Sequence, residues 1–250
     1  MTAAALTAVD PERLVREELA RRGPHGDNRF GSVLALGKAG AALARGAREA
    51  VEPSARRLLI RPHRSPALLD PGWEQKTGGH PLPDRRSVAA GERLEAWLRE
   101  LGELPPRPLL VLISGGASAC VELPAPGLTL DDLAATQRAL LGSGLPIQTV
   151  NAVRKHLSRL KGGGALKVAG GKLPRVLVLL LSDVPGDDPS AVASGPFAAD
   201  VTTFAKALAA IAGPSVINRK RSDGGYFSVL RKESRVYVAD GCTDHACGSP

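Results

Sequence analysis

Two long apolar runs constrain the fold of this chain more than any other feature. They are Leu109–Ile113 (LLVLI) and Arg175–Leu181 (RVLVLLL). Unbroken apolar runs of this length are typical of strands buried on both faces, as in parallel sheets. Ser32–Leu36 (SVLAL) and Arg57–Ile60 (RLLI) are shorter runs of the same kind. We therefore predict four strands in a sheet covered on both sides.

Segments with a helical pattern separate these strands. The first begins at Asp10, an N-cap followed by Pro11. The others are predicted at Ala41–Val51, Ser87–Leu101, Leu130–Leu141, Val150–Leu160 and Thr202–Ile211. Aromatic residues are 3% of the chain, so Leu, Val, Ile and Ala must build the core. The alternation predicts an α/β fold, a three-layer α/β/α Rossmann-like domain with a mainly parallel sheet over residues 1–212.

The loops that follow three of the strands carry the candidate chemistry. They read GKAG at residues 37–40, SGGAS at 114–118 and SDVPGDD at 182–188. In α/β sheets of this kind, ligands bind outside the carboxyl ends of the strands. Glycines, a lysine and carboxylates at that edge indicate a site for phosphate or a metal ion.

We expect the SGGAS loop to bind nucleotide phosphate through Ser114, Gly115, Gly116, Ala117 and Ser118. Its glycines let backbone N–H groups approach an anion, and its hydroxyls can donate hydrogen bonds. A ligand-free strand-to-helix turn explains the pentapeptide equally well. The loop is neither a Walker A motif nor a nucleophile elbow.

Lys38 and Asp183 are the candidate catalytic residues. A lysine after a strand can neutralise a transferring phosphoryl group, although it could also be a solvated lysine at a helix start. Asp183 and Asp187 are candidate Mg²⁺ ligands, and Asp183 could also accept a hydroxyl proton. Capping and turn formation are the alternative for these aspartates. Ser194-Gly195 could add a further backbone anion site, or form only a turn.

Asn151, Arg154 and Lys155 are the candidate substrate-binding residues, on one predicted helix. An arginine fork matches a carboxylate or a phosphate, whereas an isolated charge run is more often a solvated face. His80, in a Pro/Gly-rich loop, could be an acid or base, but a single histidine in such a loop is more often structural.

Bulk properties restrict the partners and the compartment. The net charge is +8, yet basic runs are short and no nucleic-acid-binding signature occurs, so we expect no nucleic-acid partner. No apolar run approaches the ~18–20 residues that span a bilayer. Three cysteines without framework spacing, and no signal peptide, predict a cytoplasmic protein.

Five motifs together resemble the glycerate 2-kinase family, which has a second domain of the MOFRL type and is often labelled hydroxypyruvate reductase. The motifs are GKAG (37–40), GGHPLPDRRSVAAGERL (78–94), LLVLISGGASA (109–119), NAVRKHLSRLKGGGAL (151–166) and LLLSDVPGDDPSAVASGP (179–196). The resemblance extends from about Pro11 to Leu208. It implies transfer of phosphate from ATP to D-glycerate, giving 2-phosphoglycerate, with Mg²⁺ in a cleft between two domains.

The resemblance also assigns roles to residues. Lys38 looks like the family's catalytic lysine, SGGAS like its nucleotide-phosphate loop, and Asp183 like a carboxylate near the transferring group. Arg154 and Lys155 fall in the stretch expected to line the substrate side. Hydride transfer would normally require a G-x-G-x-x-G fingerprint, which GKAG does not supply, so a reductase is the weaker reading.

Residues 213–250 differ in composition from the rest, and we expect a divergent tail in place of the family's second domain. The resemblance implies that the second domain supplies a catalytic arginine to the cleft. Loss of such a charge-stabilising arginine can lower a phosphoryl-transfer rate ~10³-fold or more. We therefore expect impaired activity for this chain alone, and self-association as a homo-oligomer through the exposed cleft face. A non-catalytic remnant that binds nucleotide or a partner protein is the alternative.

Overall fold

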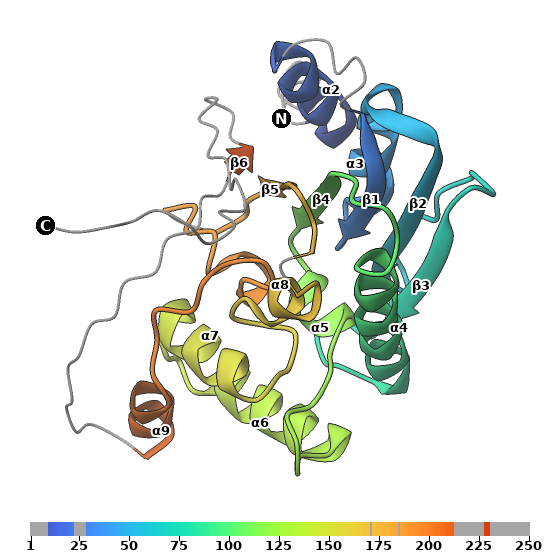
Figure 1. Ribbon diagram of the computed structural model, residues 1–250. Coiled ribbons are helices and arrows are strands. Elements are labelled where there is room, and N and C mark those ends of the chain that lie inside the picture. Colours follow the sequence, from blue (N-terminus) through green and yellow to red (C-terminus); the bar gives the residue numbers. More distant parts are fainter. Residues whose placement is uncertain (1–9, 23–28, 171, 185, 213–227, 231–250) are drawn as a thin grey trace, which may run out of the picture.

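A computed structural model describes residues 10–22, 29–170, 172–184, 186–212 and 228–230 (Figure 1). Its strands are β1 (Phe30–Leu36), β2 (Val51–Pro62), β3 (Glu74–Gly78), β4 (Leu109–Ser114), β5 (Val176–Leu181) and β6 (Ser228–Leu230). They form one sheet in the order β3-β2-β1-β4-β5-β6, and every neighbouring pair is parallel. This order is that of Rossmann folds, so the predicted fold class is confirmed.

The helices are α2 (Pro11–Arg21), α3 (Gly40–Gly46), α4 (Arg85–Leu101), α5 (Ala117–Cys120), α6 (Leu130–Gly142), α7 (Ile147–His156), α8 (Gly164–Val168) and α9 (Phe204–Ala212), with short 3-10 turns η2 (Arg48–Ala50) and η3 (Val192–Ser194). α2 and α3 cover one face of the sheet, and α4, α5 and α8 cover the other. Asp10 caps α2 as predicted, by accepting a hydrogen bond from the Glu12 N–H at 3.1 Å.

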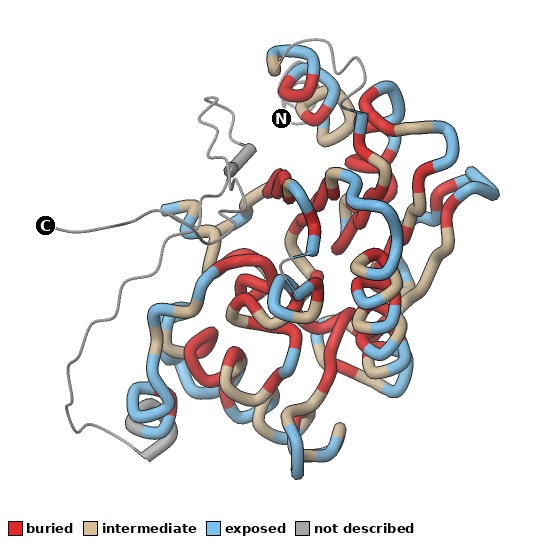
Figure 2. Tube along the Cα trace, in the orientation of Figure 1, coloured by how far each residue is buried: buried red, intermediate tan, exposed pale blue. Residues whose placement is uncertain are grey.

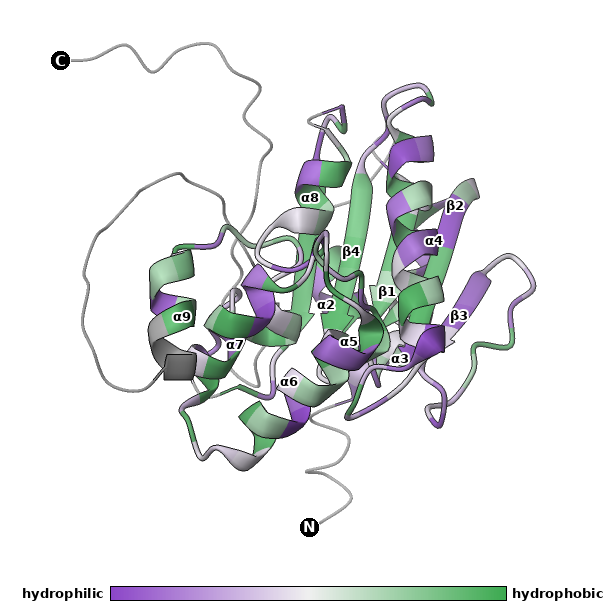
Figure 3. Ribbon diagram, turned by 90° about the horizontal axis from the view of Figure 1, so that it is seen from below, coloured by the Kyte–Doolittle hydropathy of each residue, from purple (hydrophilic) through white to green (hydrophobic). Residues whose placement is uncertain are grey.

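Successive residues of β4 show why the sheet needs both layers. Leu109, Val111 and Ile113 pack into the core beneath α4, whereas Leu110 and Leu112 pack beneath α3. All five are fully or almost fully buried, and each buried side chain of this size contributes ~1.5–3 kcal/mol. Figure 2 shows buried residues along the central strands, and Figure 3 shows β1 and β4 as hydrophobic, whereas the edge strand β3 is hydrophilic.

Helices α6, α7 and α9 form a small cluster beside the sheet (Figures 1 and 3). Leu140, Val150, Val153 and Ala207 make its separate apolar core. The 3-10 turn η3 contacts both α7, the predicted substrate-binding helix, and β4, so it links this cluster to the sheet.

Several predicted boundaries differ from the structure. The helix expected at Ala41–Val51 is α3 plus η2, because Val51 already begins β2. The helix expected at Val150–Leu160 begins at Ile147 and ends at His156. The edge strand β3 was not predicted, since its sequence EQKTG is polar and its side chains are only partly buried. Part of the expected tail, β6, pairs with β5; the other residues of 213–250 lie outside the described residues.

Candidate functional site

The order in which the chain adds strands to the sheet reverses between β1 and β4. From β1 the chain adds β2 and β3 on one side, and it then crosses back to add β4, β5 and β6 on the other. The loops that leave β1 and β4 lie on either side of this reversal. In folds of this order, ligands bind in the crevice at the carboxyl edge beside the reversal. GKAG and SGGAS are those two loops.

A glycine lets the two loops approach each other. Gly37 has φ +102°, and a Cβ there would lie 2.4 Å from the backbone oxygen of Ser114. The Lys38 N–H donates to the Gly115 carbonyl at 3.0 Å. The GKAG loop is thus fixed against SGGAS, and the exposed side chain of Lys38 lies over the second loop.

Gly116 makes room for that side chain. Its φ is +85°, and a Cβ there would lie 2.9 Å from Lys38 Cγ and 3.1 Å from Lys38 Cε. The same point is 3.3 Å from Cδ2 of His80. Lys38 and His80 therefore meet above the backbone of Gly116.

Gly115 makes the corresponding room for Asp183. A Cβ on Gly115 would lie 2.1 Å from Asp183 Oδ2 and 3.1 Å from Oδ1, so the carboxylate lies directly against the loop. Asp183 follows β5 and is exposed. The two glycines therefore bring a lysine and a carboxylate from different strands to one short stretch of backbone. Among the described residues, the N–H groups of Gly115 and Gly116 have no hydrogen-bond acceptor.

The serine hydroxyls of the loop form hydrogen bonds within the protein. Ser114 Oγ accepts from the Ala39 N–H at 3.0 Å and donates to the Leu36 carbonyl at 3.3 Å. Its hydrogen is therefore used inside the protein, where it ties the two loops together. Ser114 is 2% exposed, so a phosphate contact through its hydroxyl is not supported.

Ser118 belongs to a second hydrogen-bond network, which reaches α7 through Ser194. Ser194 Oγ donates to Asn151 Oδ1 at 3.0 Å, and that same Oδ1 also accepts from Arg154. Because Ser194 has a single hydroxyl hydrogen, Ser118 must be the donor in the 2.9 Å contact between the two serines. The hydrogen of Ser118 is therefore also unavailable to phosphate. Both serine hydroxyl hydrogens are thus used within the protein, and phosphate binding by this loop stays a prediction.

Ser194 is fully buried, so it cannot contact a ligand in this conformation. Ala193, Ser194 and Gly195 have φ values of 55°, 61° and 61°. A left-handed conformation costs a residue other than glycine ~1–2 kcal/mol. Asn151 holds this turn on both sides, since its Nδ2 also donates to the Ala191 carbonyl at 3.1 Å. Asn151, Ser194 and Gly195 thus support the loop rather than face the crevice.

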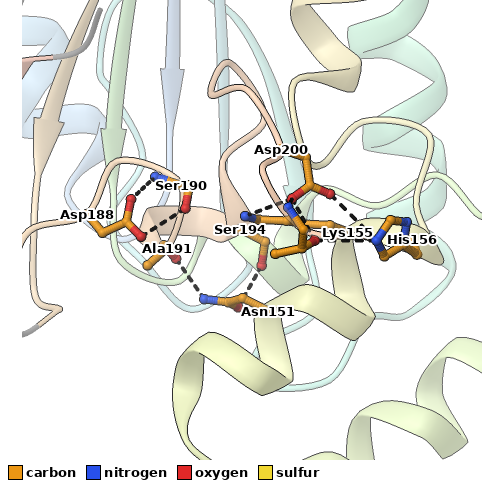
Figure 4. Close-up of polar contacts among 9 residues, drawn as sticks. Asn151, Lys155, His156, Asp188, Ser190, Ala191, Ser194 and Asp200 are labelled. Carbon is orange, nitrogen blue, oxygen red and sulfur yellow. Dashed lines mark hydrogen bonds and ion pairs between the residues drawn. The ribbon is translucent and has the colours of Figure 1, made fainter. Parts of the chain in front are cut away.

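Arg154 and Lys155, although adjacent on α7, have opposite environments. Lys155 is buried, and its Nζ lies 3.4 Å from Asp200 Oδ1, which also binds Thr202 (Figure 4). Lys155 thus forms an internal ion pair in this structure, and its predicted contact with substrate stays a prediction. Arg154 donates from Nε to Gln137 at 2.7 Å and lines a small cavity of about 20 Å³. Burial lowers the pKa of Arg154, and Glu122 partly offsets this shift.

That cavity lies beside Ser118 and contains a buried ion pair. Lys161 Nζ contacts Glu122 Oε2, and both side chains are less than a tenth exposed. The Leu123 N–H donates to the other oxygen of Glu122 at 3.1 Å. The pair is thus hydrogen-bonded on both carboxylate oxygens, as a buried charge requires.

The two other aspartates of the β5 loop lie farther along it. Asp187 has φ +48°, and its N–H donates to the Val184 carbonyl at 3.1 Å. Asp188 accepts from the N–H and hydroxyl of Ser190, so it forms a turn (Figure 4). Among the described residues, no three His, Cys, Asp or Glu side chains are arranged to hold a metal ion.

His80 was the residue that reasoning from the sequence placed least well. It sits in the loop after β3, two strands away from β1, and nothing in GGHPLPD signals that this loop returns to β4. The structure brings its ring to Lys38. Burial and the neighbouring ammonium both lower the pKa of His80 below its usual value, with burial the larger cause.

Comparisons with known proteins agree with this geometry. Residues 1–221 match the family model described as "Domain of unknown function (DUF4147)". The chain is 42% identical over 211 residues to a putative hydroxypyruvate reductase of Agrobacterium vitis, covering 84% of this chain and 46% of that protein. It is 35% identical over 207 residues to the D-glycerate 2-kinase of Thermotoga maritima, covering 82% of this chain and 47% of the relative.

A solved structure shares the fold. The crystal structure of glycerate kinase from Thermotoga maritima superposes with a TM-score of 0.70 at 32% identity, over 84% of this chain and 49% of that one. The chain thus spans less than half the length of each of these relatives. The match over residues 1–221 and the shared fold show that the chain belongs to the DUF4147 family, the N-terminal domain of glycerate 2-kinase-type proteins.

Proposed function

We propose that this chain supplies the nucleotide-binding side of a phosphotransferase of the glycerate 2-kinase type, which converts ATP and D-glycerate to ADP and 2-phosphoglycerate. One observation carries the proposal. Lys38 crosses Gly116 while Asp183 abuts Gly115, at the point where the strand order reverses. A cation, a carboxylate and two N–H groups without acceptors in the described residues meet there, which suits phosphoryl transfer.

Each group has a distinct task in this reaction. The N–H groups of Gly115 and Gly116 bind phosphate oxygens, because nothing else in the described structure accepts from them. Lys38 balances the negative charge that develops on the transferring phosphoryl group. Its placement is fixed by the 3.0 Å bond from its own N–H to the Gly115 carbonyl.

Asp183 suits the Mg²⁺ that such reactions use. Magnesium in phosphoryl-transfer sites is held by one or two carboxylates together with substrate phosphates, so a cage of three protein ligands is not required. Asp183 is exposed and lies against the phosphate loop, and Asp187 on the same loop is the second candidate. When bound, Mg²⁺ neutralises charge on the phosphates.

Arg154 is the best placed of the three predicted substrate residues. It is the one that faces the cavity beside Ser118, and its guanidinium matches a carboxylate such as that of D-glycerate. Asn151 and Lys155 act behind it, through Ser194 and Asp200.

Other readings of the chain have less support. A reductase would need a dinucleotide loop, and the β1 loop is held by Lys38 and Ser114 without the glycine fingerprint. No described helix is both long and apolar enough to cross a bilayer. Cytoplasmic location and assembly into a homo-oligomer remain proposals.

ADP release from ATP, D-glycerate and Mg²⁺ tests the proposed function. The chain is compared with Lys38→Ala, and with Lys167→Ala as a control that changes an exposed lysine of α8. Turnover that requires Lys38 and not Lys167 supports the kinase. Lys38-dependent ATP binding without turnover supports a chain that binds nucleotide only. Absence of binding contradicts both.

A further inference from the structure

The loop between β3 and α4 is held in a position that the strand order would not predict. β3 lies three strand spacings from β4, about 14 Å. Yet a Cβ on Gly78, at the end of β3, would lie 2.0 Å from the carbonyl oxygen of Cys120 in α5. The Gly79 N–H donates to Asp84 at 3.0 Å and to Ser87 at 2.9 Å. The loop is therefore anchored against α5 and at the start of α4.

This anchoring delivers His80 to the crevice. Its Cδ2 lies within 3.3 Å of the Cβ position that Gly116 leaves empty, beside the side chain of Lys38. The ring is half-buried, and its nitrogens make no hydrogen bond to any other described residue. A ring held at the phosphate loop, with nitrogens that the described protein does not use, is available to a ligand.

The charged groups around His80 come from three loops. Lys38 of the β1 loop is the one that meets it directly, above Gly116. Asp183 of the β5 loop lies against Gly115, the residue that precedes Gly116 in the loop. The carboxylate of Asp84, in the same loop as His80, accepts hydrogen bonds from Gly79, Arg86 and Ser87. Burial and, to a smaller extent, Lys38 lower the pKa of His80, which favours the neutral imidazole in the free protein.

We propose that His80 is a further catalytic residue, which accepts the proton of the acceptor's hydroxyl group during phosphoryl transfer. The inference rests on the proposed function. The hydroxyl oxygen forms the new bond to the γ-phosphorus, the bond from that phosphorus to the bridging oxygen breaks, and ADP leaves with the electron pair. The hydroxyl proton moves to a ring nitrogen of His80. A positioned base of this kind contributes ~10²–10⁴-fold to the rate.

The bound nucleotide should itself prepare this base. Phosphate groups at Lys38 neutralise the cation that disfavours protonation of His80 and add negative charge nearby, so they raise its affinity for a proton. The imidazole should therefore become more basic when ATP is in place. That change would place the bound phosphates next to the ring, and the dependence of rate on pH then separates a general base from a structural histidine.

NMR titration of the His80 imidazole in the wild-type chain, with and without saturating ATP and Mg²⁺, is the first test. We expect the pKa of His80 to be below the usual histidine value without ligand, to rise in Lys38→Met, and to rise on ATP binding. If ATP binds with a requirement for Lys38 and the His80 titration does not move, the His80 inference is overturned and the proposed function stands. If ATP does not bind, both are overturned.

Kinetics provide the second test. In any preparation with Lys38-dependent ADP release, His80→Gln should lower kcat ~10²-fold or more and remove the loss of rate at acid pH. His63→Gln, in the neighbouring loop after β2, is the matched control and should retain the wild-type pH profile. Retention of kcat within threefold in a folded His80→Gln chain overturns the inference.

Discussion

Gly115→Ala should separate the chemistry of the site from the stability of the fold. The new Cβ would lie 2.1 Å from Asp183 Oδ2, whereas ordinary contact begins at 3.4 Å, so the carboxylate must retreat by about 1.3 Å. The obstacle is the end of an exposed side chain, and the φ of Gly115 is not positive. We therefore expect the free energy of unfolding to change by less than about 1 kcal/mol.

The effect on ligands should be much larger. Misplacement of a functional group by ~1 Å can cost ~10²-fold, so we expect Mg²⁺-dependent ATP affinity to fall by one to two orders of magnitude. Calorimetric titration of ATP, with and without Mg²⁺, measures this loss. Without Mg²⁺ the affinity should change little, because Lys38 and the loop N–H groups remain in place.

Gly37→Ala is the matched comparison. Here φ is +102°, and the obstacle is the backbone oxygen of Ser114 at 2.4 Å, which cannot rotate away. The left-handed conformation costs ~1–2 kcal/mol and the steric conflict another ~1–3, so unfolding should become easier by about 2–5 kcal/mol. Urea unfolding followed by the fluorescence of Trp73 and Trp97 measures both variants. Equal destabilisation of the two variants, or unchanged Mg²⁺-dependent affinity in Gly115→Ala, would refute the reasoning.

Three further predictions concern the fold around the site. Lys161→Met leaves Glu122 buried without its partner and should destabilise the chain by ~3–5 kcal/mol, whereas Glu122→Leu combined with Lys161→Met should recover most of this loss in urea unfolding. Arg93, which is bonded to Glu74 and Glu100, lowers the pKa of Glu74. The ion pair between Arg93 and Glu74 therefore contributes its full stability above the usual carboxyl pKa of 4.5, and this contribution is lost as pH falls through the lowered value. The difference in unfolding free energy between wild type and Arg93→Met should narrow below about pH 4.5, and a constant difference would contradict this. Burial raises the pKa of Cys120 to about 12, so peptide mapping after alkylation at pH 8 should find this thiol unmodified until urea unfolds the chain.

Reasoning from the sequence was most successful for the central strands. β1, β4 and β5 are buried on both faces, and a strand in that position must be apolar along its whole length. The edge strand β3 (Glu74–Gly78) was missed because an edge strand can tolerate polar side chains, so EQKTG carries no such signal. Because the apolar runs identify these parallel strands, the loops that follow them, GKAG, SGGAS and SDVPGDD, can be assigned from the sequence to one edge of the sheet.

The partners of polar side chains could not be predicted in this way. Ser114 and Ser118 look like phosphate donors in a pentapeptide, but their hydrogens are used by Leu36 and Ser194, which lie 78 and 76 residues away. Arg154 and Lys155 are adjacent in sequence but have different partners, because successive side chains of α7 point in different directions. Lys155 pairs with Asp200, whereas Arg154 bonds to Gln137. His80 depends on a return of the β3 loop that only tertiary packing specifies.

The central claim is that phosphate binds at the carboxyl ends of β1, β4 and β5. Mapping of backbone amide NMR shifts on addition of ATP and Mg²⁺ tests it most directly. We predict that the largest shifts fall on Lys38, Gly115, Gly116 and Asp183, and that Lys38→Met abolishes them while Lys167→Met does not. Saturable shifts confined to the opposite edge of the sheet, or no shifts at the two glycines, would contradict the account.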